Sequence, residues 1–361
     1  MSTENPVVID LGSESIKAGY AHAVPSEGEP RIVTPSLVAV AGGRRRRVIE
    51  RGAVADWDGL DATLHHLLYE QLGWAPGSEG AALFVEPLLV GKAQREGLAQ
   101  LMFEGFNVMG FFTHDCAALS LFATGALTGL AADVGHGTVD VAAVVEGTTH
   151  APSAARLGFA GEELTAHLGA LLAGDAQGLA PAQLGALKVA CAAVAPSAAA
   201  FAAACGGGGG AAAAPQEYTL PDGTVFSAPP AAGLGVGEAL LEPARLGRAG
   251  PGLVDAMLEV LGEQSDASAK RAVAERVLLA GGGACADGLG RRVLSELRGQ
   301  LPPGVSPGLA ALPEYMALPG PAYVPWVGGA VMAKLVAHQG HFMVKAEYEE
   351  IGPSAVHRKC A

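Results

Sequence analysis

The sequence predicts an α/β fold in which two lobes of duplicated units surround a central nucleotide cleft. A strand–turn–strand unit occurs twice in the chain, and a glycine-rich turn lies between a strand and a helix further along. A length of 361 residues is enough for two packed lobes with a core each. With 50% hydrophobic and 16% charged residues, the composition is that of a globular protein rather than a disordered one.

The first unit, residues 7–20, reads VVIDLGSESIKAGY. Its apolar run predicts a buried strand that ends near Asp10. Gly12 and Ser13 predict a tight turn, and the alternating residues after the turn predict a return strand that includes Lys17. The unit therefore has the form of a phosphate-binding turn.

The second unit, residues 130–145, reads LAADVGHGTVDVAAVV and repeats this pattern. Asp133 again ends an apolar strand, and Gly135 and Gly137 lie in the turn. The return strand again contains a charged residue, here Asp140. Because two copies of one unit suggest a duplicated fold, we expect the two turns to face each other across a cleft.

The third turn lies in residues 276–297, between an apolar strand and a helix that Asp287 would cap. It contains Gly281, Gly282 and Gly283. A glycine-rich loop before a helix N-terminus is a general seat for anions and nucleotides. An ordinary tight turn explains any one of the three turns, but the three together favour a nucleotide cleft.

In such a cleft, backbone N–H groups of the two hairpin turns would close on the β- and γ-phosphates, where a Cβ would obstruct the approach. Asp10 and Asp133 would hold Mg²⁺ through water. Lys17 would reach the β-phosphate as a point charge. A surface turn with a solvated lysine uses the same residue types. The N–H donors would be those of Gly12, Ser13, Gly135 and Gly137.

The net charge of −13 argues against a general role in coating nucleic acid. The basic cluster from Arg44 to Arg47 is interpreted as a solvated run in a loop, with a nuclear-import or anion-binding patch as the alternative. Five scattered cysteines without a CxxC pair, and no signal peptide, predict a soluble intracellular protein.

The Ala- and Gly-rich region over 172–216 interrupts the regular pattern. It predicts a helix near 181–195 and then a flexible insert near 196–216, because five consecutive glycines do not continue a helix cheaply. After it, the sequence predicts a hairpin over 219–226 and short helices over 236–247 and 253–263.

The C-terminal sequence YVPWVGGAVMAKLVAHQGHFMVKAEYEEIGPSAVHRKCA resembles the end of an actin. Residues 87–125, YTLPDGTVF and VLLAGGGACADG follow in actin order. The resemblance implies the actin and Hsp70-type fold with ATP between two lobes. The first lobe would be 1–127 plus 318–361, and the second lobe would be 128–317.

The outer part of the first lobe departs from conventional actin, because most of the subdomain with the polymer-contacting loop is missing and only a remnant near 39–52 is left. Residues 72–89, together with DVGHGTVDVAAVVEG, resemble the class-seven actin-related proteins of plants. That resemblance implies a nuclear protein of chromatin-remodelling assemblies.

The resemblance also implies which parts of the nucleotide site are retained and which are lost. The retained positions are Asp10, Gly12, Ser13, Lys17, Asp133, Gly135, Gly137, Gly281 and Gly282. Cys116 aligns with the glutamine that orients the attacking water, His136 with an acidic residue of the second turn, and Asp140 with the histidine behind it. Near the base, Ala286 aligns with a tyrosine, Cys285 with a methionine and Lys188 with a ribose-contacting glutamate.

Glu14 adds a negative charge to the first turn. A carboxylate about 4 Å from a phosphate charge costs around 4 kcal/mol at an effective dielectric constant near 20. One charge-assisted N–H contact returns only about 1.5 to 3 kcal/mol. Glu14 would therefore have to point away for tight binding to survive, and we expect ATP binding to be at most weak.

These features favour a non-enzymatic nuclear actin-related protein, a structural subunit of an ATP-dependent chromatin-remodelling complex with at most weak binding of ATP and Mg²⁺. Its expected partners are a helix of the remodelling ATPase, docked in a groove, and a second actin-related protein. We expect no sequence-specific nucleic acid contact, no membrane contact and no self-polymer, and some protein in the cytoplasm as well. The alternatives are a slowly hydrolysing cytoskeletal actin-like protein and a sugar or acetate kinase.

Overall fold

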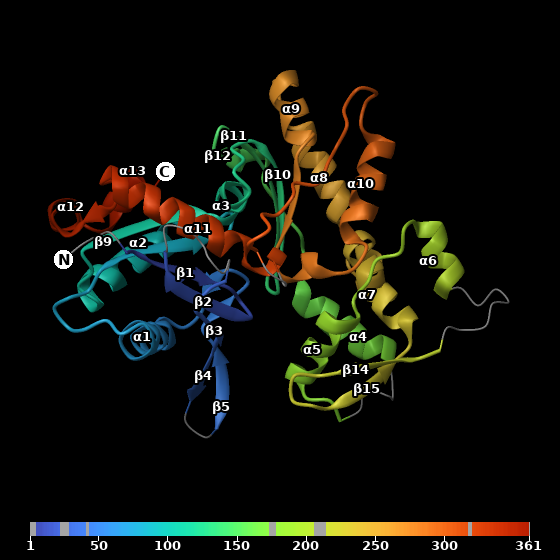
Figure 1. The fold of residues 1–361 in the computed structure, drawn as a ribbon, viewed down its shortest axis with the longest axis horizontal. Coiled ribbons are helices and arrows are strands. Elements are labelled where there is room, and N and C mark those ends of the chain that lie inside the picture. Colours follow the sequence, from blue (N-terminus) through green and yellow to red (C-terminus); the bar gives the residue numbers. More distant parts are fainter. Residues whose placement is uncertain are drawn as a thin grey trace.

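The computed structural model describes residues 5–21, 29–40, 43–172, 178–205, 214–316 and 320–360. Within these ranges the chain forms two main sheets with helices packed around them (Figure 1). The first sheet has the strand order β17-β9-β8-β1-β2-β3. Its strands are β1 (Val7–Leu11), β2 (Ser15–Tyr20), β3 (Ile32–Pro35), β8 (Ala81–Glu86), β9 (Gly110–Asp115) and β17 (Met343–Val344).

The second sheet has the order β12-β11-β10-β16, and β13 also pairs with β11. Its strands are β10 (Gly129–Val134), β11 (Val139–Val145), β12 (Thr148–Thr149), β13 (Ala155–Arg156) and β16 (Val277–Ala280). Three small two-stranded sheets pair β4 (Leu37–Val40) with β5 (Arg44–Arg47), β6 (Ile49–Glu50) with β7 (Ala53–Val54), and β14 (Gln216–Thr219) with β15 (Val225–Ala228).

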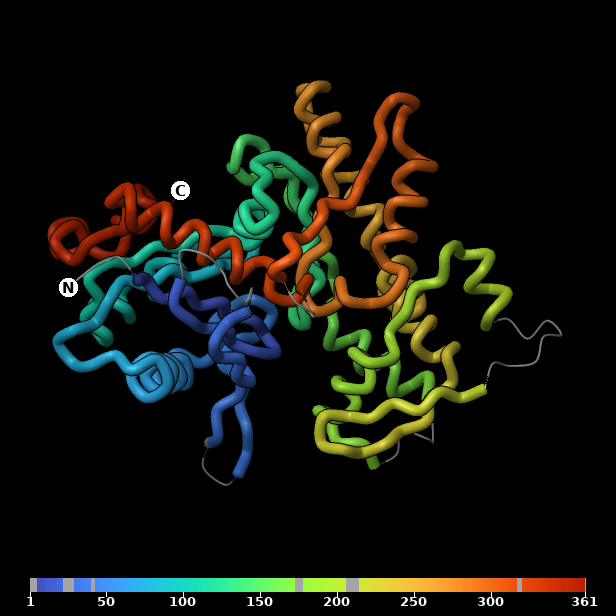
Figure 2. The backbone as a smooth tube through the Cα atoms, viewed as in Figure 1, coloured from blue at the N-terminus to red at the C-terminus, as the bar shows by residue number. Residues whose placement is uncertain are grey.

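The helices fall into two groups along the chain. The group associated with the first sheet is α1 (Trp57–His65), α2 (Lys92–Gln100), α3 (Cys116–Ala123), α11 (Gly320–Gln339), α12 (Lys345–Ile351) and α13 (Val356–Lys359). The other group is α4 (Gly161–Leu172), α5 (Pro181–Cys191), α6 (Ala198–Cys205), α7 (Pro230–Leu241), α8 (Leu253–Gly262), α9 (Ala267–Ala274) and α10 (Leu289–Gln300). After α10 the chain returns to the first sheet, where α11 packs on β1 and α3 (Figure 2).

The two sheets repeat one arrangement of strands. β1 pairs antiparallel with β2 and parallel with β8, and β10 pairs antiparallel with β11 and parallel with β16. Central parallel strands are covered on both faces, and accordingly every residue of β8 is buried. The predicted α/β fold with a repeated strand–turn–strand unit is confirmed.

Two hydrophobic cores underlie this arrangement. One core is built mainly on β1, β8 and α11, and the other on β10, β11 and the helices α4 to α10. Ala131 and Leu278, although they lie in the second sheet, belong to the first core, so the two cores meet at that sheet. The lobe boundaries at 127/128 and 317/318 stay a prediction.

Several local predictions are confirmed and others are wrong. The hairpin β14-β15 and the helix α8 form where they were expected. The run from Arg44 to Arg47 is not a loop but strand β5, because β4 provides an antiparallel partner. Asp287 does not cap α10, because Gly288 occupies the N-cap position with a φ of 82°, in the left-handed region.

The predicted insert is partly helical. α5 ends at Cys191, short of the predicted end at 195, and α6 forms over Ala198–Cys205 within the predicted flexible segment. Alanine has the highest intrinsic helix propensity, which explains this second helix. Residues 206–213 lie outside the described residues. α7 begins at Pro230 rather than at 236. None of the helices in the described ranges combines the length and apolar character needed to cross a membrane.

Candidate functional site

A cavity of about 330 Å³ lies where the β1-β2 and β10-β11 hairpins face each other. This volume is within the range of small-molecule sites. We call it the central cavity. All ten residues that the sequence predicted for a nucleotide site line it: Asp10, Gly12, Ser13, Lys17, Asp133, Gly135, Gly137, Gly281, Gly282 and Gly283.

The first hairpin contributes an ion pair to the central cavity. Asp10 and Lys17 occupy directly opposed positions on β1 and β2, and Lys17 Nζ lies 2.9 Å from Asp10 Oδ2. Burial acts to lower the pKa of Lys17, but the charges of Asp10 and Asp133 outweigh it, and the pKa is raised. Lys17 is therefore a cation whose charge Asp10 already compensates.

The second hairpin places two carboxylates at the same opposed positions. Asp133 on β10 faces Asp140 on β11. Asp140 is 1% exposed and binds Arg156 of β13 through two hydrogen bonds of 2.6 and 2.8 Å. Asp133 lacks such a pair, and burial, reinforced by Asp140 and Asp10, raises its pKa to about 7. A protonated Asp133 is therefore accessible near neutral pH.

Cys116 begins α3 beside these carboxylates, where the family resemblance implies a water-orienting glutamine. Its side chain is 3% exposed. Burial, together with the charges of Asp133, Asp140 and Asp115, raises the pKa of the thiol well above its usual value. The thiol is neutral, and it provides neither the amide of a glutamine nor a general base.

The tips of the two hairpins are in direct contact. A Cβ added to Gly137 would lie 2.3 Å from Ser13 Oγ, so only glycine permits this approach. The third turn is equally close to the second hairpin: Gly281 has a φ of 84°, and a Cβ there would lie 2.3 Å from Asp133 Oδ1. The three predicted turns therefore form one structural unit around the central cavity.

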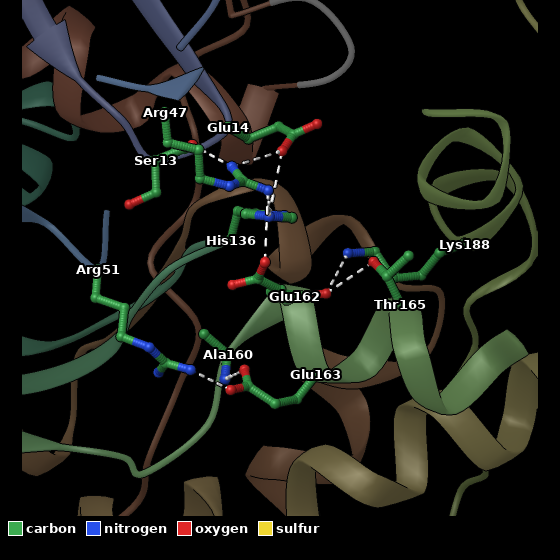
Figure 3. A network of polar contacts seen from close by, with 11 residues as sticks. Ser13, Glu14, Arg47, Arg51, His136, Ala160, Glu162, Glu163, Thr165 and Lys188 are labelled. Atoms are coloured by element: carbon green, nitrogen blue, oxygen red, sulfur yellow. Dashed lines mark hydrogen bonds and ion pairs between the residues drawn. The ribbon is translucent and has the colours of Figure 1, made fainter. Parts of the chain in front are cut away.

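Glu14 lines the central cavity and is part of a charged cluster (Figure 3). Its carboxylate Oε2 lies 3.2 Å from His136 Nε2 and 3.7 Å from Arg47 Nη1, and the side chain is 61% exposed. Burial lowers the pKa of His136, while Glu14 acts in the opposite direction. The Glu14 carboxylate therefore lies next to Arg47 and the second turn.

The lining of the central cavity also includes Ala286, Cys285 and Leu240. Lys188 also lines it, and its Nζ donates a 2.8 Å hydrogen bond to the carbonyl of Gly161. Burial lowers the pKa of Lys188. Tyr323, which the sequence did not single out, is the tyrosine of this lining. Ala286 offers no ring on which a base could stack.

The donor set fits a magnesium nucleotide only in part. The hairpin turns and the Gly281–Gly283 turn provide backbone at the position of a phosphate, and Asp10 and Asp133 provide carboxylates at the position of a metal. However, the lining contains the carboxylates of Asp10, Glu14 and Asp133 against two lysines. A triphosphate therefore gains little net attraction here. Among the described residues, no group of three or more His, Cys, Asp or Glu side chains is arranged to hold a metal ion.

Sequence reasoning missed the residues that join the two hairpins from outside. Arg47 and Arg51, in the β5 to β7 segment, reach Glu162 and Glu163 at the start of α4. The run of arginines was visible, but Glu162, with which Arg47 pairs, lies more than a hundred residues away in the sequence. The nearest sequence signal was a pair of glutamates in the first turn of a helix, where negative charge is favourable.

The family model for actin matches residues 1–202 and 183–361 of the chain. Actin-related protein 7 of Arabidopsis thaliana is 34% identical over 98% of this chain and 99% of its own length. Actin-related protein 7 of rice, Oryza sativa subsp. indica, is 36% identical over the same shares of the two chains. The protein of the same name from subsp. japonica has the same identity and coverage.

Proposed function

This chain belongs to the actin family, among its actin-related proteins, and from this premise we propose that it is a non-enzymatic structural subunit of a nuclear chromatin-remodelling assembly. The predicted resemblance to the class-seven actin-related proteins of plants is confirmed. The proposal adds three elements to that membership: at most weak binding of ATP and magnesium, no effective hydrolysis, and a partner helix rather than a polymer.

The observation that supports weak binding most directly is the internal pairing of charges around the central cavity. Lys17 is paired with Asp10 at 2.9 Å, and Lys188 donates to the carbonyl of Gly161. A nucleotide must compete with these partners for both lysines. Asp133, with its pKa raised to about 7, must also lose its proton before it holds magnesium through water as a carboxylate.

The position of Cys116 argues against hydrolysis. Phosphoryl transfer depends mostly on positioning and on neutralising charge, and a group must orient the attacking water. A buried neutral thiol is a poor group for that purpose. His136, the other polar group near the second turn, is engaged with Glu14 and with Arg47, whose Nη2 lies 3.3 Å from His136 Nε2.

The proposed partner is an amphipathic helix of a remodelling ATPase, with a second actin-related protein as a further candidate. In place of a large outer subdomain, the described residues between β3 and α1 form the small β4-β5 and β6-β7 sheets. This shortening removes a main filament contact of conventional actin and supports a subunit that does not polymerise. Co-purification of the full chain from nuclei with a remodelling ATPase is the expected result, and recovery only as a free cytosolic monomer contradicts it.

Nucleotide binding is tested by thermal unfolding with and without 1 mM Mg-ATP. If the dissociation constant is about 1 mM or weaker, ligand linkage adds at most about 0.4 kcal/mol, which corresponds to about 1 °C. We expect no larger rise in the melting temperature of the wild type. A rise of several degrees contradicts weak binding.

The same experiment on Glu14→Gly and Glu14→Gln tests whether Glu14 is the residue that weakens the binding of Mg-ATP. Both variants remove the negative charge, and only the first adds the freedom of glycine. If Glu14 is the main obstacle, Mg-ATP raises the melting temperature of both variants. If neither responds, the other substitutions of the cavity disable it as well. Release of phosphate above background, or sedimentation after salt and Mg-ATP are added, would favour the ATP-hydrolysing filament protein instead.

A further inference from the structure

Two arginines of the β5 to β7 segment, which forms small sheets of its own, reach the start of α4, next to the second hairpin. We propose that these contacts form a cross-cavity ion network that keeps the two hairpins closed on each other without nucleotide. The network consists of Arg47, Arg51, Glu14, His136, Glu162 and Glu163. The proposal deepens the proposed function, on which it rests, because a subunit that binds nucleotide weakly needs another means of keeping a fixed shape.

Arg47 is the centre of the network (Figure 3). Its Nη1 donates a 2.9 Å hydrogen bond to the carbonyl of Ser13 in the first turn. Its Nη2 lies 3.3 Å from His136 Nε2 in the second turn and 3.5 Å from Glu162 Oε1 on α4. One guanidinium group therefore contacts both hairpin turns and the helix that follows the second one.

Arg51 makes the second connection, with Glu163 Oε1. Glu163 is well fixed, because its other oxygen accepts a 2.8 Å hydrogen bond from the N–H of Ala160, and Arg248 Nη2 lies 3.1 Å from Oε1. Its side chain is only 13% exposed. Arg51 has a φ of 48°, a value that non-glycine residues rarely adopt, and this conformation aims the side chain at α4.

Contacts between uncharged groups also hold the two hairpin turns in the closed arrangement. Ser13 packs against Gly137, and a Cβ on Gly52 would lie 3.7 Å from Thr138 Cγ2 of the second turn. The N–H of Gly52 donates a 3.2 Å hydrogen bond to Ser13 Oγ, so the segment with Arg51 is fixed on the first turn. Ion pairs between partly exposed groups are individually weak. Several ion pairs that connect the same two hairpins can together shift the equilibrium between the closed and the open arrangement of the cavity.

Glu14 gives the network its independence from nucleotide. A phosphate between the hairpins would provide negative charge that attracts both turns. Here the chain has its own carboxylate in the first turn, and it interacts with Arg47 and with His136 of the second turn. The anion that bridges the hairpins is therefore part of the protein, and salt rather than nucleotide should control closure.

The test measures the distance between the two sides of the cavity by single-molecule FRET in nucleotide-free full-length protein. Dyes are attached at Asp58→Cys on α1 and Asp222→Cys in the β14-β15 turn, with the exposed Cys205 replaced by serine; positions 58, 222 and 205 are all exposed. We expect the double variant Arg47→Ala/Arg51→Ala to increase the open population about tenfold in 50 mM salt, because two weak charged connections are lost. Salt at 0.5 M should shift the wild type in the same direction, because it shortens the Debye length.

The matched control is Arg44→Ala/Arg45→Ala, which removes the same charge from the exposed part of the same strand. We expect no change in its distance distribution. The charge swap Arg51→Glu/Glu163→Arg should restore most of the closed population. The proposal is overturned if the two double alanine variants behave alike, or if salt leaves the wild type unchanged.

The outcomes also separate this proposal from the proposed function. Suppose that the wild type is closed without nucleotide and that the double variant is open, but that the wild type binds Mg-ATP tightly. This result refutes only the proposed weak binding. Wild type that binds Mg-ATP weakly and is open in its absence refutes only the network. Far-ultraviolet circular dichroism of each variant excludes unfolding as the cause of an open distance.

Discussion

Opposite Asp10 on the first hairpin stands Lys17, whereas opposite Asp133 on the second hairpin stands Asp140. The backbone arrangement is the same, since each aspartate ends a central strand before a glycine turn. In the first pair the opposite charges of Asp10 and Lys17 neutralise each other, with Lys17 Nζ 2.9 Å from Asp10 Oδ2. The second pair repels, and it depends on Arg156 from β13 and on a proton at Asp133.

The difference teaches that a duplicated backbone unit does not determine the electrostatics of its site. In the first hairpin the stabilising charge is local and lies within the unit itself. In the second hairpin it is brought by a strand outside the unit, and the pKa of the remaining carboxylate, Asp133, is raised. The second hairpin should therefore be more sensitive to single substitutions and to pH than the first.

The largest effect is expected from Arg156→Met, which removes the external cation of the second hairpin. Asp140 is 1% exposed, and the carbonyl of Leu88 loses a donor as well. Removing one partner of a buried ion pair costs about 3 to 5 kcal/mol. We expect a loss of this size in the free energy of unfolding, measured with urea.

The control for Arg156 is Arg271→Met, since Arg271 forms an exposed pair with Glu275 on α9 and should cost less than about 0.5 kcal/mol. The double variant Asp140→Asn/Arg156→Met should recover more than half of the loss, because no buried charge is left. Equal losses in Arg156→Met and Arg271→Met would show that the second hairpin does not depend on its external cation.

The next largest effect is a pH dependence at Asp133. Its pKa is about 7 in the folded protein and about 3.9 in an unfolded chain. The folded state therefore holds a proton that the unfolded state has released. This contribution to stability is complete below pH 4 and is lost as the pH rises through 7.

Asp133→Asn removes this dependence. Relative to the wild type, the variant should gain about 2 to 3 kcal/mol in the free energy of unfolding between pH 5 and pH 8, because one pKa unit corresponds to about 1.4 kcal/mol. Asp10→Asn removes one of the charges that raise the pKa of Asp133, so it should move the pH dependence to lower pH without abolishing it. A difference between Asp133→Asn and wild type that stays constant with pH contradicts the raised pKa.

A smaller effect is expected from Lys17→Met in the first hairpin. The ion pair with Asp10 is partly buried, with side-chain exposures of 14% and 15%, so we expect a loss of about 1 to 2 kcal/mol. Lys17 also lowers the pKa of Asp133. The pH dependence of stability should therefore move to higher pH in this variant, which a urea titration at several pH values measures. A loss as large as that of Arg156→Met would remove the contrast between the hairpins.

The sequence was sufficient to predict the duplicated unit and ten of the residues that line the central cavity, because strand, aspartate and glycine turn recur at the same spacing. The charge that Glu14 adds to the first turn was visible as well, but its contacts with Arg47 and His136 were not. These inferences depend on local pattern and on charge alone.

The rest depends on contacts between distant segments. A run of four arginines has no alternation of apolar and polar residues, so strand β5 is visible only once Leu37–Val40 pairs with it. The role of Arg156 follows from a pairing of β13 with β11. Arg51 and Glu163 meet only after the two sheets are placed, and neither residue belongs to a motif.

The smallest effect is expected at the tip of the first hairpin, from Glu14→Gln. Position 14 corresponds to Gly137 in the repeat, but the glutamate is 61% exposed and its ion pairs lie at 3.2 and 3.7 Å. Exposed pairs contribute less than about 1 kcal/mol, and many contribute nothing measurable. We therefore expect the free energy of unfolding to change by less than about 0.5 kcal/mol at pH 7.

Gly137→Ala, at the matching tip, should lower the free energy of unfolding by more in the same urea titration, because its Cβ would lie 2.3 Å from Ser13 Oγ and 3.1 Å from the backbone of Arg51. If Glu14→Gln proved the more costly of the two, charge rather than close packing would hold the tips together even against global unfolding.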